Sequence, residues 1–176
     1  LGSMDISIGS ALGVSCILET LILNATGNIW YAILASLGVT VFFGLVNSVV
    51  SSWLRLPMII TSLFLMFLGQ GVQLMICEQT SASILIEGFD FSLWKSTAFQ
   101  LVVLVVTFLA VGFLFNYTLL GKYARAIGEN EACARQSGVN TVRYRAVAFL
   151  IMAVCVTVGS IFLISRTASA GRTTGA

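Results

Sequence analysis

The chain has 176 residues, of which 58% are hydrophobic and only 9% charged, and its formal net charge is +2. A soluble domain carries about 25% charged residues, so this composition excludes an ordinary water-soluble globule. Nine Lys and Arg residues provide no basic stripe for nucleic acid. The chain has no histidine and no C-x-x-C pair, which argues against a zinc or iron–sulfur site.

The composition predicts an all-α integral membrane protein, because lipid requires each segment to satisfy its own backbone hydrogen bonds. A spanning helix needs about 20 mostly apolar residues. We expect a single membrane domain over residues 1–176, a polytopic bundle in which one helix is short or broken. The five expected spans cover residues 8–23, 29–51, 57–77, 97–118 and 146–165, and the first of them is the short one.

The segment 119–145 between the last two spans is expected in the cytoplasm. Five of the nine basic residues lie there, and such an excess marks cytoplasmic loops. These residues are Lys122, Arg125, Arg135, Arg143 and Arg145.

Within that loop, residues 128–138 predict a short capped helix. Asn130 can cap its N-terminus, Glu131 complements the positive end of the helix dipole, and Gly138 can end the helix in a left-handed conformation. So short a helix is unstable alone in water, so the adjoining spans or a docked cytoplasmic partner must hold it. The alternative is a positively charged loop that only fixes the topology.

The same segment carries a resemblance to a known family. Residues 121–140, GKYARAIGENEACARQSGVN, resemble the cytoplasmic signature of ribose-type ABC importer permeases, G-[RK]-Y-x-x-A-[IL]-G-x-N-x-x-A-A-R-x-S-G-[IV]-N. Residues 4–10, MDISIGS, are similar to that family's G-G-[IM]-D-[LI]-S-[VI]-G-S. Residues 44–47, 56–61 and 165–170 match further pieces in the same order, so the resemblance covers nearly the whole chain.

The resemblance implies a permease that pairs with a second permease copy and two cytoplasmic ATP-binding subunits, and that receives a monosaccharide from an extracytoplasmic binding protein. The chain would lie in the bacterial plasma (inner) membrane as a multi-pass protein. It would bind no cofactor, since it has no G-x-x-x-x-G-K-[ST] loop and the partner would handle ATP and magnesium. The resemblance assigns the ATPase-coupling helix to Gly128, Glu129, Asn130, Glu131, Ala132, Arg135, Ser137 and Gly138.

A substrate pathway is expected near the first span. An acid is expensive in hydrocarbon, so Asp5 there indicates either function or a partner; capping of a helix at the membrane surface is the alternative for Asp5 and Ser7. Asn47, Gln70 and Gln73 lie inside apolar spans and either face substrate or hydrogen-bond between helices. The expected pathway residues are Asp5, Ser7, Gly9, Ser10, Asn47 and Gln70.

Other readings remain beside the sugar permease. Gln70 stands where relatives often carry arginine, and Leu63 where they carry glycine, which leaves the substrate open. A permease for a nucleoside, an amino acid or a signalling sugar is one alternative, and a non-transporting scaffold subunit is another. An intramembrane enzyme would need a clustered nucleophile and base, and the spans offer no such set. Both ends of the chain read as cuts through a longer permease.

Overall fold

A computed structural model describes residues 5–53, 58–80, 83–86, 91–171 and 174. The expected motif residues Met4, Leu56 and Pro57 lie outside this part of the chain. The fold is all-α, as expected. In chain order the elements are α1 (Ile8–Thr26), α2 (Ile29–Trp53), α3 (Met58–Thr80), β1 (Ser83–Leu85), α4 (Ser92–Lys95), α5 (Thr97–Tyr117), α6 (Leu119–Glu129), α7 (Glu131–Gln136), α8 (Thr141–Thr167) and β2 (Ser169–Gly171).

Five of these helices, α1, α2, α3, α5 and α8, are long and apolar enough to cross a membrane. At 19 residues α1 is the shortest of the five, and it is continuous rather than broken. It also extends beyond the expected residue 23. It ends where Gly27 adopts φ +64° and donates its backbone N–H to the Leu23 carbonyl at 2.8 Å, a left-handed ending that glycine accommodates without strain.

The last span is longer than the sequence suggested. We expected residues 146–165, whereas α8 begins five residues earlier, where the Asn140 side chain accepts a hydrogen bond from the Arg143 backbone N–H at 3.1 Å. It continues to Thr167, beyond which Ala168 takes a left-handed conformation. The basic stretch before the apolar run was read as loop because charge dominates it, but its Asn cap makes it the first turn of the helix.

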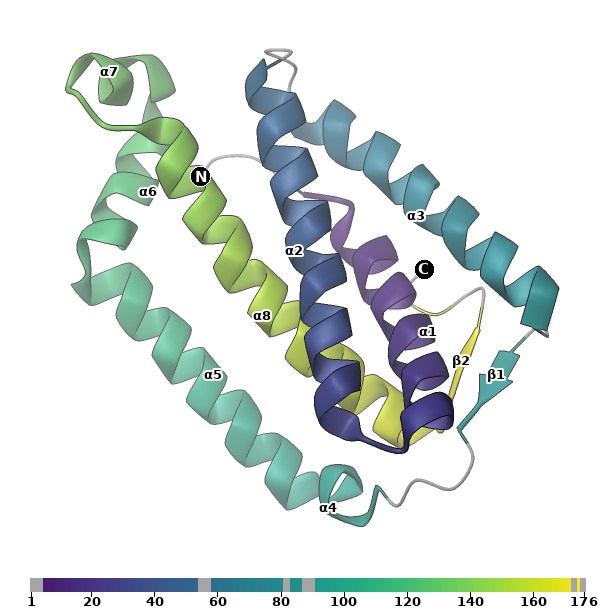
Figure 1. Cartoon of the computed structure of the whole chain (residues 1–176). Coiled ribbons are helices and arrows are strands. Elements are labelled where there is room, and N and C mark those ends of the chain that lie inside the picture. The colour runs from purple at the N-terminus through teal and green to yellow at the C-terminus, as the bar shows by residue number, and fades with distance from the viewer. Residues whose placement is uncertain (1–4, 54–57, 81–82, 87–90, 172–173, 175–176) are drawn as a thin grey trace.

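The helix α1 is the centre of the bundle. It lies among α2, α3 and α8 (Figure 1), and 56% of its apolar span is buried, against none of the α5 span. A core cluster that includes Cys16, Ile17, Cys77 and Ile164 joins α1 to α3 and α8. By contrast α5 meets the rest of the chain chiefly through α4 and α6 at its two ends (Figure 1).

A two-stranded antiparallel pair closes the end of the bundle at which α1 ends. The strands β1 and β2 align Ser83 with Gly171 and Leu85 with Ser169. The Asn24 side chain of α1 donates to the Leu85 carbonyl at 2.8 Å. These contacts hold the segments that follow α3 and α8 against the end of α1 (Figure 1).

Candidate functional site

The expected short helix is present as α7. The Oδ1 atom of Asn130 accepts a hydrogen bond from the Cys133 backbone N–H at 3.1 Å, and Glu131 lies in the first turn. After the helix, Gly138 adopts φ +80°. The predicted cap, first-turn acid and left-handed glycine are confirmed. Gly128 and Glu129, however, belong to the end of α6 rather than to the same short helix.

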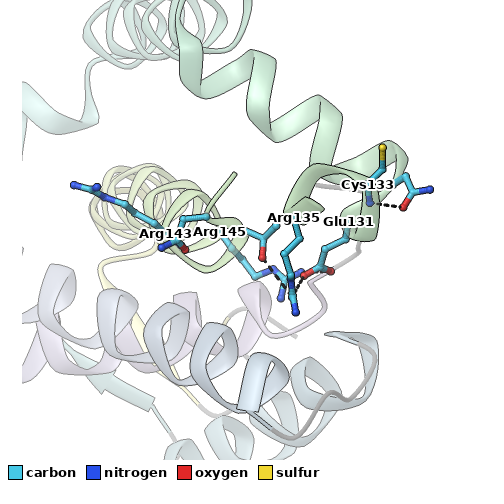
Figure 2. Close-up of polar contacts among 8 residues, drawn as sticks. Glu131, Cys133, Arg135, Arg143 and Arg145 are labelled. Atoms are coloured by element: carbon cyan, nitrogen blue, oxygen red, sulfur yellow. Dashed lines mark hydrogen bonds and ion pairs between the residues drawn. The ribbon is translucent and has the colours of Figure 1, made fainter. Parts of the chain in front are cut away.

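Glu131 joins α7 to the long helix α8. Its Oε1 atom lies 3.0 Å from Nη2 of Arg135 on α7, and its Oε2 atom lies 2.9 Å from Nη2 of Arg145 on α8 (Figure 2). The side chain of Arg145 is only 13% exposed. Arg143 points away from this cluster (Figure 2). One carboxylate therefore fixes the short helix to the first turns of the span.

The electrostatics of this cluster favour the ionised carboxylate. Partial burial raises the pKa of Glu131, but the charge and hydrogen bond of Arg145, followed by those of Arg135, outweigh it and leave the pKa of Glu131 below its ordinary value. A charge-assisted pair of this kind is stronger than a hydrogen bond between neutral groups. The contact between α7 and α8 is thus intact at neutral pH.

The helix α6, which the sequence analysis treated as loop, sets the direction in which the chain leaves α5. Gly121 lies so close to the Phe115 carbonyl that a Cβ atom would overlap it. The Arg125 guanidinium donates to that same carbonyl at 3.1 Å, which satisfies an end group of α5. The buried face of α6 is Gly121, Ala124 and Ile127. Their three-residue spacing was the signal for this helix.

The outer surface of α7 is open to solvent. Of the residues assigned to the coupling helix, Glu131 is half-buried and the others are exposed, namely Gly128, Glu129, Asn130, Ala132, Arg135, Ser137 and Gly138. Ala134 faces inward and is buried. The helix α7 is therefore bound to α8 on one side through Glu131 and exposed on the other.

The second group of expected residues lies at the start of α1. The Oδ1 atom of Asp5 accepts hydrogen bonds from the Ser7 backbone N–H at 2.9 Å and from the Ser7 hydroxyl at 2.6 Å. The Ser10 hydroxyl donates to the Ser7 carbonyl at 2.9 Å. Ser7 and Ser10 are buried and Gly9 is half-buried. Asp5 therefore bonds to Ser7, the residue before α1, through one of its two carboxylate oxygens, and no side chain caps α1 itself among the described residues.

The polar residues inside the spans divide into two kinds. The Nε2 atom of Gln73 donates to the Ser10 carbonyl at 3.1 Å, so Gln73 links α3 to α1. Asn47 is fully buried on α2, yet neither end of its amide has a hydrogen-bond partner in the described part of the chain. Gln70 is half-buried on α3, about two and a half turns along that helix from Thr61.

The sequence analysis missed a buried acid in α1. Glu19 has no exposed surface, and its Oε1 atom accepts a hydrogen bond of 2.6 Å from the Ser160 hydroxyl of α8. The Ser160 hydroxyl also lies 3.3 Å from that of Ser36 on α2. A lone ionisable residue within an apolar stretch was the available signal, because such residues are rare in spans.

Comparison with known proteins identifies the family of this chain. Residues 1–174 match the family model described as the permease component of a branched-chain amino acid transport system. The chain belongs to this permease family. This confirms the resemblance seen in the sequence, and the chain is therefore a multi-pass protein of the bacterial inner membrane. The family is one of transporter permeases rather than of enzymes. No solved structure matches the chain.

Three of the curated relatives are named for sugar import. This permease is 29% identical over 171 residues to the L-arabinose transport system permease protein AraH of Escherichia coli (strain K12), covering 96% of this chain and 52% of that relative. It is 30% identical over 177 residues to the fructose import permease protein FruF of Bifidobacterium longum (strain NCC 2705), covering 96% and 49%. The ribose import permease protein RbsC of Escherichia coli (strain K12) is 28% identical over 182 residues, covering 98% and 56%. The chain spans about half the length of these relatives.

Proposed function

We propose that this chain is part of the membrane-spanning permease of an ABC importer for a monosaccharide, and that α7 is the element through which a cytoplasmic ATPase acts on it. The observation that supports the coupling role is the ion pair between Glu131 of α7 and Arg145 of α8. A helix of six residues could not transmit force if it were free to unwind. Its cap and its ion pair to α8 make it move with that span.

The proposed mechanism is mechanical. Closure of two ATPase subunits around ATP displaces α7, and α8 and α5 carry that displacement into the bundle. Two contacts connect the segments along this route. One is the close approach of Gly121 to the Phe115 carbonyl between α5 and α6, and the other is the set of ion pairs that Glu131 forms. ATP and its magnesium ion belong to the partner subunits, because the sequence has no phosphate-binding G-x-x-x-x-G-K-[ST] loop.

The proposed substrate is a monosaccharide because relatives named for arabinose, fructose and ribose import match over nearly the whole chain. An extracytoplasmic binding protein would deliver the sugar, and a second permease copy would complete the pathway. A second candidate substrate is a signalling sugar derivative. It is favoured by the autoinducer 2 import system permease protein LsrC of Escherichia coli (strain K12 / DH10B), which is 31% identical over 152 residues, covering 84% of this chain and 44% of that relative.

The test is co-purification of the full-length protein with its ATPase subunit. The variant carries Glu131→Lys with Gly138→Val, which reverses the bracing charge and introduces a side chain at a left-handed position. The matched control carries Glu78→Lys with Gly112→Val. Glu78 is exposed at the far end of α3, and nothing lies within 4 Å of a Cβ atom at Gly112 on α5.

We expect the wild type and the control to retain the ATPase and the variant to lose it while still inserting in the membrane. Equal retention by all three proteins would reduce the 119–145 segment to a topology signal. Retention in all three with no sugar uptake would favour the scaffold alternative.

A further inference from the structure

Two buried polar side chains at one end of the bundle have no hydrogen-bond partner among the residues that the structure describes. Asn47 on α2 is 0% exposed and Thr61 on α3 is 3% exposed. Within the described residues, neither the amide oxygen and nitrogen of Asn47 nor the hydroxyl of Thr61 has a hydrogen-bond partner. A buried polar group without a partner costs about 1–3 kcal/mol. Native proteins contain few such groups, and each one requires an explanation.

The register of α2 and α3 puts the two side chains at about the same level along the bundle. Ala11 and Val14 of α1, Phe43 of α2 and Leu65 of α3 form a packed apolar cluster. Asn47 follows Phe43 by four residues and Thr61 precedes Leu65 by four. Residues four apart lie on the same helix face. Because α2 runs antiparallel to α3 (Figure 1), both steps lead in the same direction, one turn beyond the cluster.

The start of α1 is at about this level as well. Ser7 precedes Ala11 by four residues on the same face of α1 and is 2% exposed. The Oδ2 atom of Asp5, two residues earlier, is a fourth buried polar atom without a partner in the described residues. We call Asp5, Ser7, Asn47 and Thr61 the polar layer. It contains one carboxylate, two hydroxyls and one amide, contributed by the two residues Asp5 and Ser7 before α1 and by α2 and α3.

Cohesion between helices does not explain the polar layer. Polar side chains that hold these helices together do form bonds: Gln73 reaches the Ser10 carbonyl, and Thr40 lies 3.3 Å from the Ala153 carbonyl and 3.2 Å from the Thr157 hydroxyl. Asn47 and Thr61 are buried at similar depth and form no such bond in the described part of the chain. Apolar residues would pack there at lower cost.

We propose that the polar layer is a binding site for a neutral, hydroxyl-rich solute, and that α1, α2 and α3 separate at this layer when the transporter opens. An amide and a hydroxyl each donate and accept hydrogen bonds, as sugar hydroxyls do, and the free oxygen of Asp5 accepts. The closed arrangement leaves these groups unsatisfied, so contact with solute or water on opening recovers the lost hydrogen bonds. This inference rests on the proposed import function.

The test uses thiol labelling of the full-length transporter with its ATPase and binding protein, in a background where Cys133 and Cys155 are replaced. Thr61→Cys and Asn47→Cys are compared with Thr40→Cys, which changes an equally buried threonine that has partners. We expect a charged, water-soluble thiol reagent to modify the first two several-fold faster during ATP turnover than at rest, and sugar to slow the modification. Thr40→Cys should stay unreactive.

A second measurement covers the possibility that a cysteine variant does not fold. Thr61→Val removes a hydroxyl that has no partner in the described part of the chain and should raise the melting temperature of the resting transporter, whereas Thr40→Val removes a bonded hydroxyl and should lower it. Thr61→Val should also raise the KM of uptake.

If Thr61→Cys reacts no faster than Thr40→Cys in a transporter that binds its ATPase and imports sugar, the polar layer is not the site, although the import function stands. A fall in melting temperature for Thr61→Val equal to that of Thr40→Val would also overturn the proposal, because it would mean that the Thr61 hydroxyl has a partner. Loss of ATPase binding and of uptake in the parent protein would instead count against the import function.

Discussion

The hydroxyl of Ser160 donates a hydrogen bond of 2.6 Å to the Oε1 atom of Glu19, at a point where neither side chain has any exposed surface. The bond joins the central helix α1 to α8, whose Arg145 forms the ion pair with Glu131 of α7. It is the closest polar link between these two helices among the hydrogen bonds of the described residues. Loss of this hydrogen bond should therefore lower the free energy of unfolding.

We predict that Ser160→Ala lowers the free energy of unfolding of the full-length protein by about 1–3 kcal/mol, because it leaves a carboxyl oxygen buried without its donor. Glu19→Gln retains an oxygen that can accept from Ser160, so its effect should be smaller. Thermal unfolding of the two single variants and of the double variant forms a cycle that isolates the pair. Strictly additive effects would mean that the two side chains do not interact.

The cap of α7 should be separable from its ion pair. We predict that Asn130→Ala destabilises the short helix by about 1 kcal/mol, because the Cys133 N–H loses its acceptor. Asn130→Asp keeps an acceptor and is the matched control. Hydrogen exchange of the amides in Glu131–Gln136 is the measurement, and faster exchange is expected only in the alanine variant. Equal protection in both variants would show that the cap is dispensable.

The ion pairs of Glu131 predict a pH dependence. A carboxylate whose pKa is lower in the folded protein than in the unfolded chain stabilises the fold above the unfolded value, and this stabilisation disappears as the pH falls through the folded value. The pKa of Glu131 is lowered, so its contribution should be constant near neutral pH and lost in acid below the ordinary glutamate range.

The measurement is the difference in melting temperature between wild type and Glu131→Gln across this pH range. The difference should shrink towards zero in acid and also in high salt, since the glutamate is partly exposed. A difference that grows as the pH falls would contradict the assignment of the shift to Arg145 and Arg135.

The junction between α5 and α6 should not tolerate a side chain at Gly121. A Cβ atom there would overlap the Phe115 carbonyl, which is backbone and cannot move aside cheaply. We predict that Gly121→Ala lowers the melting temperature and weakens ATPase retention. Gly112→Ala is the control in the neighbouring helix, where an added Cβ atom meets nothing within 4 Å. Equal melting temperatures and equal ATPase retention in the two variants would show that the junction between α5 and α6 has room for a side chain.

The features that the sequence predicted are those whose signals are local. The α7 helix was predictable because Asn130, Glu131 and Gly138 each act on the backbone within a few residues of themselves. The helix α6 was missed because its basic residues suggested loop, although Gly121, Ala124 and Ile127 repeat at helical spacing. The polytopic all-α class followed from composition alone.

The features that the sequence did not predict depend on contacts between distant segments. Glu19 and Ser160 are 141 residues apart, and nothing near either residue specifies the other. The same holds for Asn47, whose distinguishing property is that its amide has no partner within the described residues, which depends on the packing of several helices. Thr61 was quoted only as part of a motif, and its place in the polar layer required the register of α3 against α2.

The length of α8 ties this protein to the thickness of its bilayer. Its 27 residues extend about 40 Å, whereas the 21 residues of α5 extend about 31 Å, close to a hydrocarbon core of about 30 Å. A helix longer than the core must tilt or protrude, and the extra turns of α8 carry Arg145, the residue that holds α7. Lipids with longer or shorter acyl chains would change the tilt of α8 and, through it, the angle at which α7 meets the proposed ATPase. The proposed transport should therefore depend on acyl-chain length even where no lipid binds to the protein specifically.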